Sequence, residues 1–234
     1  MIYLSARCIY ICKLLLRMKN KFKGIIYYSK IVKDNDLYIK VLSSKDEVNS
    51  GMVYGGNSSK KKLIYQNGYF LDYTISKKNQ SSPPIFSADI SKPFIGNIYN
   101  DKYKMNALLS ILSLINLSIL EGQYIKGFYT DIEFIVNIII NKNRWIIEYC
   151  EWLFNLLQKI GYQIDYKKNV NYKFYDMLNQ EFTAISNINS IEFPHKLFSN
   201  EKQINFKNIN AIFAIFESIF LRNHLDGTKY NMPM

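Results

Sequence analysis

Apolar side chains recur at every second position over much of the N-terminal part of the chain, which is the period of a half-buried β-strand. The clearest case is residues 69–76, whose side chains divide into two faces: Tyr69, Leu71, Tyr73 and Ile75 on one, and Phe70, Asp72, Thr74 and Ser76 on the other. Further strands are predicted at residues 22–31, 37–43, 51–54 and 85–90. Short strands with no long helix among them predict a small barrel, closed or partly open.

A basic loop joins the strands predicted at residues 51–54 and 69–76. Its turn and charge positions are, in order, Gly55, Gly56, Lys60, Lys61, Lys62, Asn67 and Gly68. The three glycines are expected to supply positive φ values, so that the chain reverses tightly and presents three ammonium groups between two strands. The alternative is a surface hairpin whose lysines are only solvated.

After Met105 the apolar period changes to about 3.6, which predicts helices. They are expected over residues 105–121, 131–140, 144–160 and 208–225, with Gly122, Gly161 and Gly227 as stop signals. Residues 161–199 show no sustained period and are predicted to be irregular, with short elements around 173–177 and 193–198.

The helix predicted over residues 144–160 is apolar nearly all round. Its polar residues recur at steps of three or four and form one stripe: Arg144, Glu148, Glu151, Asn155 and Gln158. This pattern predicts a helix that is buried over most of its surface.

Composition adds a bias in charge. The chain has 234 residues, 48% of them hydrophobic, which suffices for two domains. Its formal net charge of +11 suits a polyanionic partner, either nucleic acid or an anionic membrane surface. Enrichment in Ile, Asn, Lys, Tyr and Phe also arises in AT-rich genomes, so part of this charge carries no functional meaning.

Metal binding and catalysis find little support. Cys8, Cys12 and Cys150 include no CxxC pair, so neither structural zinc nor another cofactor is predicted; Cys150 is expected to be a buried, reduced thiol, which fits a cytoplasmic protein. No GxxxxGK[ST] or GxGxxG element is present. His224 and Asp226 are too close along a helix end to face one another, so the chain is predicted not to be an enzyme.

The first residues are apolar without having the features of a membrane anchor. Arg7 and Lys13 interrupt the run at residues 2–16, which is too short to span a bilayer, and no small-residue cleavage site follows. Residues 1–17 are therefore predicted to be a dispensable leader, and no membrane partner is expected.

Several stretches, taken in order, resemble the RecO family of recombination mediators. In the N-terminal part they are Gly24-Ile25-Ile26, residues 51–56 (GMVYGG) with the basic run at 60–62, and residues 66–72 (QNGYFLD). In the C-terminal part they are residues 151–157 (EWLFNLL), residues 161–165 (GYQID), Phe193-Pro194 and residues 221–225 (LRNHL). The resemblance begins near residue 19 and continues to the end of the chain.

The resemblance implies an α+β protein: an N-terminal five-stranded OB-type β-barrel followed by a C-terminal α-helical domain. We assign residues 18–95 to an OB-fold-like nucleic-acid-binding domain and residues 96–234 to the helical domain, with an irregular insert at 161–206. The implied function is a non-enzymatic DNA repair mediator that binds and anneals DNA and helps load the strand-exchange recombinase. Implied partners are single- and double-stranded DNA, the single-stranded-DNA-binding protein, RecR and, indirectly, RecA.

Two departures from the family pattern stand out. Many RecO proteins hold a four-cysteine zinc knuckle just after the segment that matches residues 161–165, whereas residues 166–199 here contain no cysteine. The family's basic loop is usually rich in arginine, whereas this one is lysine, which keeps the charge but not the bidentate phosphate geometry.

Candidate DNA-binding residues combine cations with aromatic rings, because such barrels follow phosphates with a basic groove and stack bases on rings. They are Lys60, Lys61, Lys62, Lys23, Lys30, Tyr54 and Lys77, with Tyr27, Tyr28 and Tyr38 as further stacking positions and Lys33, Lys40 and Lys78 as further cations. Each tyrosine is also compatible with ordinary strand packing.

A second candidate site lies in the helical part. The acidic, apolar tail of a partner protein needs an apolar groove with a cation beside it, and the candidate cations are Lys126, Lys142 and Arg144. The alternative function for the whole chain is a generic basic nucleic-acid-binding protein, for single-stranded DNA or ribosome-associated RNA.

Overall fold

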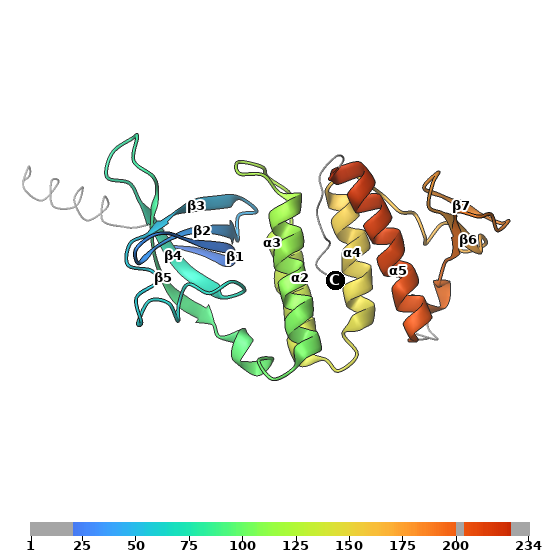
Figure 1. Cartoon of the computed structure of the whole chain (residues 1–234), viewed down its shortest axis with the longest axis horizontal. Coiled ribbons are helices and arrows are strands. Elements are labelled where there is room, and N and C mark those ends of the chain that lie inside the picture. The colour runs from blue at the N-terminus through green and yellow to red at the C-terminus, as the bar shows by residue number, and fades with distance from the viewer. Residues whose placement is uncertain (1–20, 200–203, 226–234) are drawn as a thin grey trace, which may run out of the picture. The chain divides into compact units, whose positions relative to one another are not determined.

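The computed structural model describes residues 21–199 and 204–225, so the predicted leader at residues 1–17 lies outside the described residues. The chain forms two compact units (Figure 1). The first comprises the described residues up to Tyr99 together with Ile119–Tyr124, and the second comprises Asn100–Ser118 and the described residues from Ile125 onward. The domain boundary assigned between residues 95 and 96 stays a prediction.

The first unit is a closed five-stranded barrel, as predicted. Its strands are β1 (Phe22–Lys33), β2 (Asp36–Ser43), β3 (Val48–Val53), β4 (Phe70–Ser76) and β5 (Ile85–Lys92). They follow one another around the barrel in the order β1-β2-β3-β5-β4, and all neighbours are antiparallel except β3 and β5. The five predicted strands are confirmed, with shifts of a few residues at their ends.

Alternation along these strands fills the barrel core. Ile26, Ile39 and Leu71 are fully buried there, together with the ring of Tyr73. Phe70 departs from the predicted pattern, because it belongs to the outer face of β4 and is nevertheless buried. The ring of Phe94, in the short helix η1 (Phe94–Asn97), meets it edge-on with centroids 5.5 Å apart and covers that end of the face.

A bulge in β1 decides which side chains point outward. Ile26 lies opposite Val41 of β2 and Tyr28 lies opposite Lys40, so Tyr27 is an extra residue in the pairing. Tyr27 is only 3% exposed, and its hydroxyl has no hydrogen-bond partner among the described residues. The prediction that Tyr27 is a stacking platform is therefore wrong, because its ring is buried, whereas Tyr28 is only half-buried.

Two of the three glycines around the basic loop adopt the predicted conformation. Gly55 has φ +64° and Gly68 has φ +90°. Gly56 has no such φ value, so the prediction was wrong there, and close packing explains this glycine instead. A Cβ on Gly56 would lie 3.0 Å from side-chain atoms of Leu37 and Val53.

The seam between β3 and β5 closes the barrel through very few contacts. Met52 is paired with Ile85, and the Met52 N–H donates to the carbonyl oxygen of Pro84 at 2.8 Å. Gly51 allows this approach, because a Cβ at that position would lie 2.3 Å from the Pro84 oxygen. That distance is far inside van der Waals contact, and a backbone atom cannot rotate away.

Gly51→Ala is expected to open or strain this seam and to lower the free energy of unfolding by about 1–3 kcal/mol, the usual cost of overpacking. Thermal unfolding followed by circular dichroism measures the change. Gly96→Ala is the matched control, because a Cβ on Gly96 meets nothing within 4 Å. Equal stability of the Gly51 and Gly96 variants would show that the seam tolerates a side chain.

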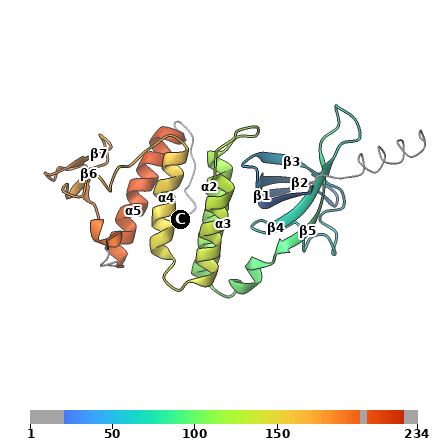
Figure 2. The same cartoon turned by 180° about the vertical axis from the view of Figure 1, so that it is seen from behind.

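The second unit contains four α-helices within its described residues: α2 (Lys102–Ser118), α3 (Phe128–Asn141), α4 (Ile146–Lys159) and α5 (Phe206–Ile219). They stand side by side in Figures 1 and 2. The four predicted helices are confirmed with shifts at their ends: α2 and α3 begin three residues earlier than expected, α5 begins two earlier and α4 two later. α5 passes into a π-helix, η3 (Phe220–His224). No described helix is long and apolar enough to cross a membrane.

Cys150 confirms the prediction of a buried thiol. It lies in α4 with no exposed surface and forms no disulfide. Burial, helped by the negative charge of Glu151, raises the pKa of this thiol to about 12. A thiol that keeps its proton at neutral pH is a poor nucleophile, so Cys150 acts as a core residue.

The segment predicted to be irregular contains a small sheet. Three strands, β6 (Phe174–Asp176), β7 (Glu181–Thr183) and β8 (Ser190–Glu192), pair antiparallel in the order β7-β6-β8 and precede the short helix η2 (His195–Leu197). The expected elements near residues 173–177 and 193–198 are present, whereas β7 and β8 were not predicted. Each has only three residues, too few for a period to be recognised.

Candidate nucleic-acid interface

Tyrosines and lysines alternate on the outer face of β1 and β2. Tyr28 lies opposite Lys40, and Lys30 lies opposite Tyr38. Residues that face one another in an antiparallel pair project from the same side of the sheet, and so do residues two apart on one strand. These four side chains therefore form one surface, which we call the tyrosine–lysine face.

One contact within the tyrosine–lysine face brings a cation onto an aromatic ring. The Lys40 ammonium lies 5.5 Å from the centre of the Tyr28 ring. Tyr28, Tyr38 and Lys40 are half-buried, whereas Lys30 is exposed. The ring positions are thus held by the strands while parts of their surfaces stay accessible to a ligand.

Tyr54 continues this surface beyond β3. Tyr38 is paired with Met52, and Tyr54 follows two residues later, just past the end of the strand, with 45% of its surface exposed. The Lys78 ammonium lies 5.7 Å from the centre of the Tyr54 ring, and the Lys61 ammonium donates to the Tyr54 carbonyl oxygen at 2.8 Å. One cation therefore lies over this exposed ring, and a second, from a different loop, binds the backbone of the same residue.

The basic loop that carries Lys61 is anchored at both ends. The Gly55 N–H donates to Asp36 Oδ1 at 2.7 Å, next to the tyrosine–lysine face. Further along, Tyr65 is buried in the barrel core and its hydroxyl accepts from the Ala88 N–H at 3.0 Å. The lysines between these anchors therefore lie on a loop that hydrogen bonds hold to the barrel at both ends.

The other predicted cations fall into different positions. Lys60 and Lys62 are exposed and make no ion pair with a described residue, and Lys77 is exposed immediately after β4. Lys23 lies near the opposite end of β1 from Lys30, and in the β-ladder it is opposite Asp72 of β4. The structure brings Lys30, Tyr54 and Lys61 to one side of the barrel and leaves Lys23 away from them.

This arrangement suits a single-stranded nucleic acid. Aromatic faces stack on bases of any sequence, and ammonium groups neutralise the phosphates between them. Sequence reasoning found the residue types but could not find the pairing of Tyr28 with Lys40, because the bulge at Tyr27 that sets it leaves no sign in the hydrophobic pattern.

The helical unit offers an apolar pocket of about 210 Å³ among α2, α4 and α5. Its lining residues are mainly aromatic or aliphatic: Tyr103, Asn106, Ala107, Ser110, Leu114, Trp145, Ile146, Tyr149, Leu153, Phe213 and Phe216. Of the three predicted partner-binding cations, Arg144 directly precedes the lining residue Trp145. Lys142 is paired with Glu148 at 2.9 Å, and Lys126 lines neither this pocket nor the one described next.

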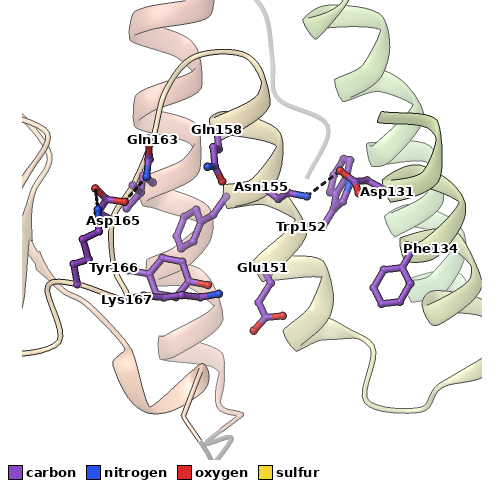
Figure 3. Close-up of a pocket in the computed structure, with 13 residues that line it drawn as sticks. Asp131, Phe134, Glu151, Trp152, Asn155, Gln158, Gln163, Asp165, Tyr166 and Lys167 are labelled. Carbon is purple, nitrogen blue, oxygen red and sulfur yellow. Dashed lines mark hydrogen bonds and ion pairs between the residues drawn. The ribbon is translucent and has the colours of Figure 1, made fainter. Parts of the chain in front are cut away.

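A larger pocket of about 500 Å³ lies between α3, α4 and the segment after α4 (Figure 3). Most of the polar stripe predicted for residues 144–160 opens into it, since Glu151, Asn155 and Gln158 all contribute to its lining. Aromatic side chains, among them Phe134 and Tyr166, form other parts of the wall.

The chain is similar to several curated proteins that share one name. The chain is 30% identical over 153 residues to "DNA repair protein RecO" of Rickettsia akari, which covers 64% of this chain and 63% of that protein. The proteins of the same name from Rickettsia bellii and Rickettsia typhi are each 29% identical over 153 residues, with 62% and 63% of their lengths covered. The resemblance to the RecO family is confirmed. No protein-family model matches the chain, and the match spans less than two thirds of the length of these RecO proteins.

The segment that follows residue 165 lacks the cysteines of the zinc knuckle expected from the RecO resemblance. Residues 166–199 contain no cysteine, and the described residues hold no group of three or more His, Cys, Asp or Glu side chains placed to bind a metal. The described residues therefore offer no donor set that fits zinc, and metal-free folding stays a prediction.

A buried carboxylate organises this segment instead. Asp176, at the end of β6, accepts hydrogen bonds from the backbone N–H groups of Leu178 and Asn179 at 2.8 and 2.9 Å, and from the side-chain amides of Asn179 and Asn187. These bonds, led by the Asn179 N–H and the Asn187 amide, hold the pKa of Asp176 below its ordinary value. The carboxylate ties the β6–β7 turn to the loop before β8.

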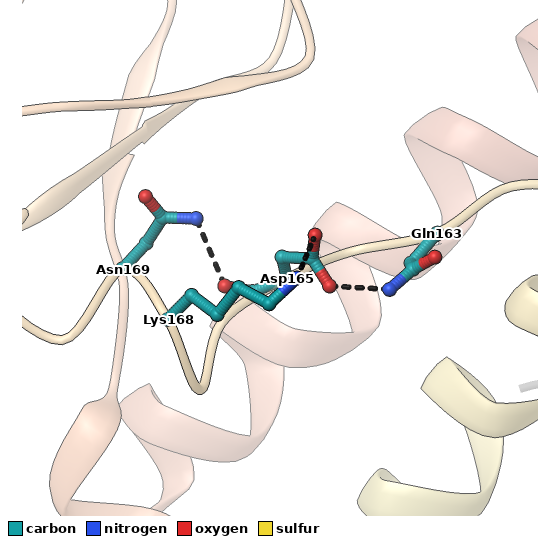
Figure 4. Close-up of polar contacts among 4 residues, drawn as sticks. All are labelled: Gln163, Asp165, Lys168 and Asn169. Atoms are coloured by element: carbon teal, nitrogen blue, oxygen red, sulfur yellow. Dashed lines mark hydrogen bonds and ion pairs between the residues drawn. The ribbon is translucent and has the colours of Figure 1, made fainter.

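The RecO-like GYQID segment ends in a turn built on Asp165 (Figure 4). Gln163 donates to one carboxylate oxygen, Lys168 is paired with the other at 3.5 Å, and Asn169 donates to the Asp165 carbonyl oxygen at 2.9 Å. The acidic residue of this motif therefore closes the loop that follows α4.

The RecO-like LRNHL segment forms most of η3, and its side chains bind the small sheet and α2. Arg222 donates to the carbonyl oxygens of Met177 and Leu178, at 2.8 and 3.2 Å, and thus holds the β6–β7 turn. His224 Nε2 donates to the Leu117 carbonyl oxygen near the end of α2, at 3.0 Å. His224 is used structurally, whereas Asp226 lies outside the described residues.

Asp176→Asn is expected to weaken the small sheet, because it removes the charge that four donors point toward. Hydrogen exchange should show faster exchange in β6 and β8.

The stabilisation by Asp176 should also depend on pH. Because folding lowers the pKa of this carboxyl, the stabilisation is present above its ordinary pKa of about 3.9 and is lost as pH falls through the pKa of the folded state. The difference in stability between wild type and variant should therefore shrink below about pH 4. Asp34→Asn, in an exposed turn, is the control; equal exchange in all three proteins would contradict the assignment.

Proposed function

We propose that this chain is a DNA-binding DNA repair protein that acts as a recombination mediator. The observation that carries the proposal is the tyrosine–lysine face on the barrel, extended by Tyr54 with Lys61 and Lys78. The similarity to proteins named DNA repair protein RecO supports the same conclusion.

Single-stranded DNA would lie across β1, β2 and the end of β3. Bases stack on Tyr28, Tyr38 and Tyr54, while phosphates approach the ammonium groups of Lys30 and the basic loop. Both kinds of contact are independent of sequence, as a repair protein requires. Stacking uses the face of a base and leaves its pairing edge free, so a bound strand can still anneal with a complementary strand.

The finer role follows from the RecO resemblance. We propose that the protein acts without catalysis, on single- and double-stranded DNA, with the single-stranded-DNA-binding protein and RecR, and that it helps RecA onto the strand. A generic protein for single-stranded DNA or ribosome-associated RNA is the alternative. Annealing of complementary strands coated by the single-stranded-DNA-binding protein separates the two, because only a mediator accelerates that reaction.

The aromatic contribution can be tested without changing charge. Replacing Tyr28 and Tyr38 together by alanine should weaken binding to oligothymidine by about fivefold to 140-fold for each base that loses a stack, from about 1–3 kcal/mol per base. The dependence on salt should stay the same, and the matched Tyr28→Phe, Tyr38→Phe variant should bind like the wild type. Unchanged affinity of a folded double alanine variant would exclude the tyrosine–lysine face.

The same titrations test the basic loop. Lys60→Ala with Lys62→Ala should flatten the slope of log affinity against log salt by about 1.4 units, at about 0.7 per phosphate contact on a single strand. Lys61 is kept, because its ammonium holds the Tyr54 carbonyl. Lys102→Ala, in the helical unit, is the control for a lost surface charge, and an unaltered slope in the loop variant would mean that these lysines are only solvated.

For the partner protein, we propose that the apolar pocket beside Arg144 takes an acidic tail with an apolar end. The pocket receives the apolar residue, and the guanidinium pairs with a carboxylate. Fluorescence of Trp145 can follow titration with an aspartate-rich peptide that ends in phenylalanine. Arg144→Ala should weaken binding about tenfold or more, whereas Lys126→Ala should have little effect; equal affinities would remove Arg144 from the site.

A further inference from the structure

The larger pocket of the helical unit combines aromatic and acidic side chains. Four aromatic residues, Phe134, Trp152, Phe154 and Tyr166, line it together with carboxylates and amides. Phe134 is 60% exposed, although it is a large apolar side chain in the middle of α3. In Figure 3 Glu151 lies between Tyr166 on one side and Phe134 on the other.

Most charges around this pocket are already neutralised. Asp131 is paired with Lys159 at 3.0 Å and accepts from Asn155, and Asp165 is paired with Lys168. Glu151 differs, because it is exposed and makes no hydrogen bond or ion pair with any described residue. Glu151 is thus a carboxylate among aromatic rings that pairs with no described cation.

One ring of this pocket, that of Tyr166, already has a cation beside it. The Lys167 ammonium lies 5.8 Å from the centre of the Tyr166 ring, on the rim of the same pocket. Cations are attracted to aromatic faces by the ring quadrupole, and the attraction grows when a carboxylate lies nearby. DNA, which is a polyanion, would be repelled from Glu151.

We propose that this pocket binds an arginine side chain presented by a segment of a partner protein. A guanidinium can stack on Tyr166 or Phe134 while its N–H groups donate to the Glu151 carboxylate and to the amide oxygen of Asn155. Lysine is a poorer fit, since an ammonium lacks the planar fork that reaches several acceptors at once and stacks on a ring. This inference stands apart from the proposed DNA surface, which lies in the other unit.

The test uses the full chain and two short acetylated, amidated peptides that differ at one position, arginine in one and the neutral isostere citrulline in the other. The indole N–H signal of Trp152 in an NMR titration reports binding. The arginine peptide should shift this signal, and Glu151→Gln should weaken binding roughly tenfold or more, the size expected for a lost charge-assisted hydrogen bond. Phe134→Ala should weaken it as well.

Glu181→Gln is the matched control, because Glu181 is an exposed carboxylate on β7 that does not line the pocket. Its affinity for the arginine peptide should equal that of the wild type, and oligonucleotide binding should be unaffected by Glu151→Gln. The proposal is overturned if the arginine peptide causes no shift, if the citrulline peptide binds as well, or if Glu151→Gln leaves the affinity unchanged. Each of these results would leave the DNA proposal untouched.

Discussion

The extra residue at Tyr27 is the constraint on which the surface of the barrel depends. Without the bulge, Tyr27 would lie opposite Lys40 and Tyr28 would point into the core, because a shift of one residue exchanges the two faces of a strand. The buried Tyr27 hydroxyl has no hydrogen-bond partner among the described residues, which is an unfavourable contribution to stability. In exchange, the bulge sets Tyr28 and Lys30 beside Lys40 and Tyr38, and bulges commonly re-aim side chains in this way.

This constraint also marks the limit of sequence reasoning. The five strands, the helices and the buried Cys150 could be predicted, since each rests on a period that the core enforces over many residues. The choice between Tyr27 and Tyr28 could not be made, because both are aromatic and lie in one strand, and pairing alone separates them. The strands β7 and β8 escaped prediction for a related reason: three residues carry no period, and hydrogen bonds to Asp176 organise that segment instead.

The motifs that resemble RecO divide between structure and surface. In the helical unit Asp165 closes a turn and Arg222 fastens η3 to the small sheet, so these segments hold the unit together. In the barrel the segment from Gly51 to Gly56 has two roles. Gly51 allows the close approach of β3 and β5, and Tyr54 is exposed to solvent with the Lys78 ammonium over its ring. The candidate binding residues are therefore those side chains that have no structural role in either unit. Such residues are the tyrosines and lysines on the outer face of the barrel, and Glu151 in the helical unit.

Photo-cross-linking locates bound DNA most directly. A single-stranded oligonucleotide that carries 5-iodouracil forms covalent bonds to aromatic side chains on which its bases stack, and mass spectrometry of the digested complex identifies them. DNA bound to the outer face of β1, β2 and the end of β3 predicts cross-links at Tyr28, Tyr38 or Tyr54. Cross-links confined to the helical unit, or to the part of the barrel around Lys23 and Asp72, would contradict it.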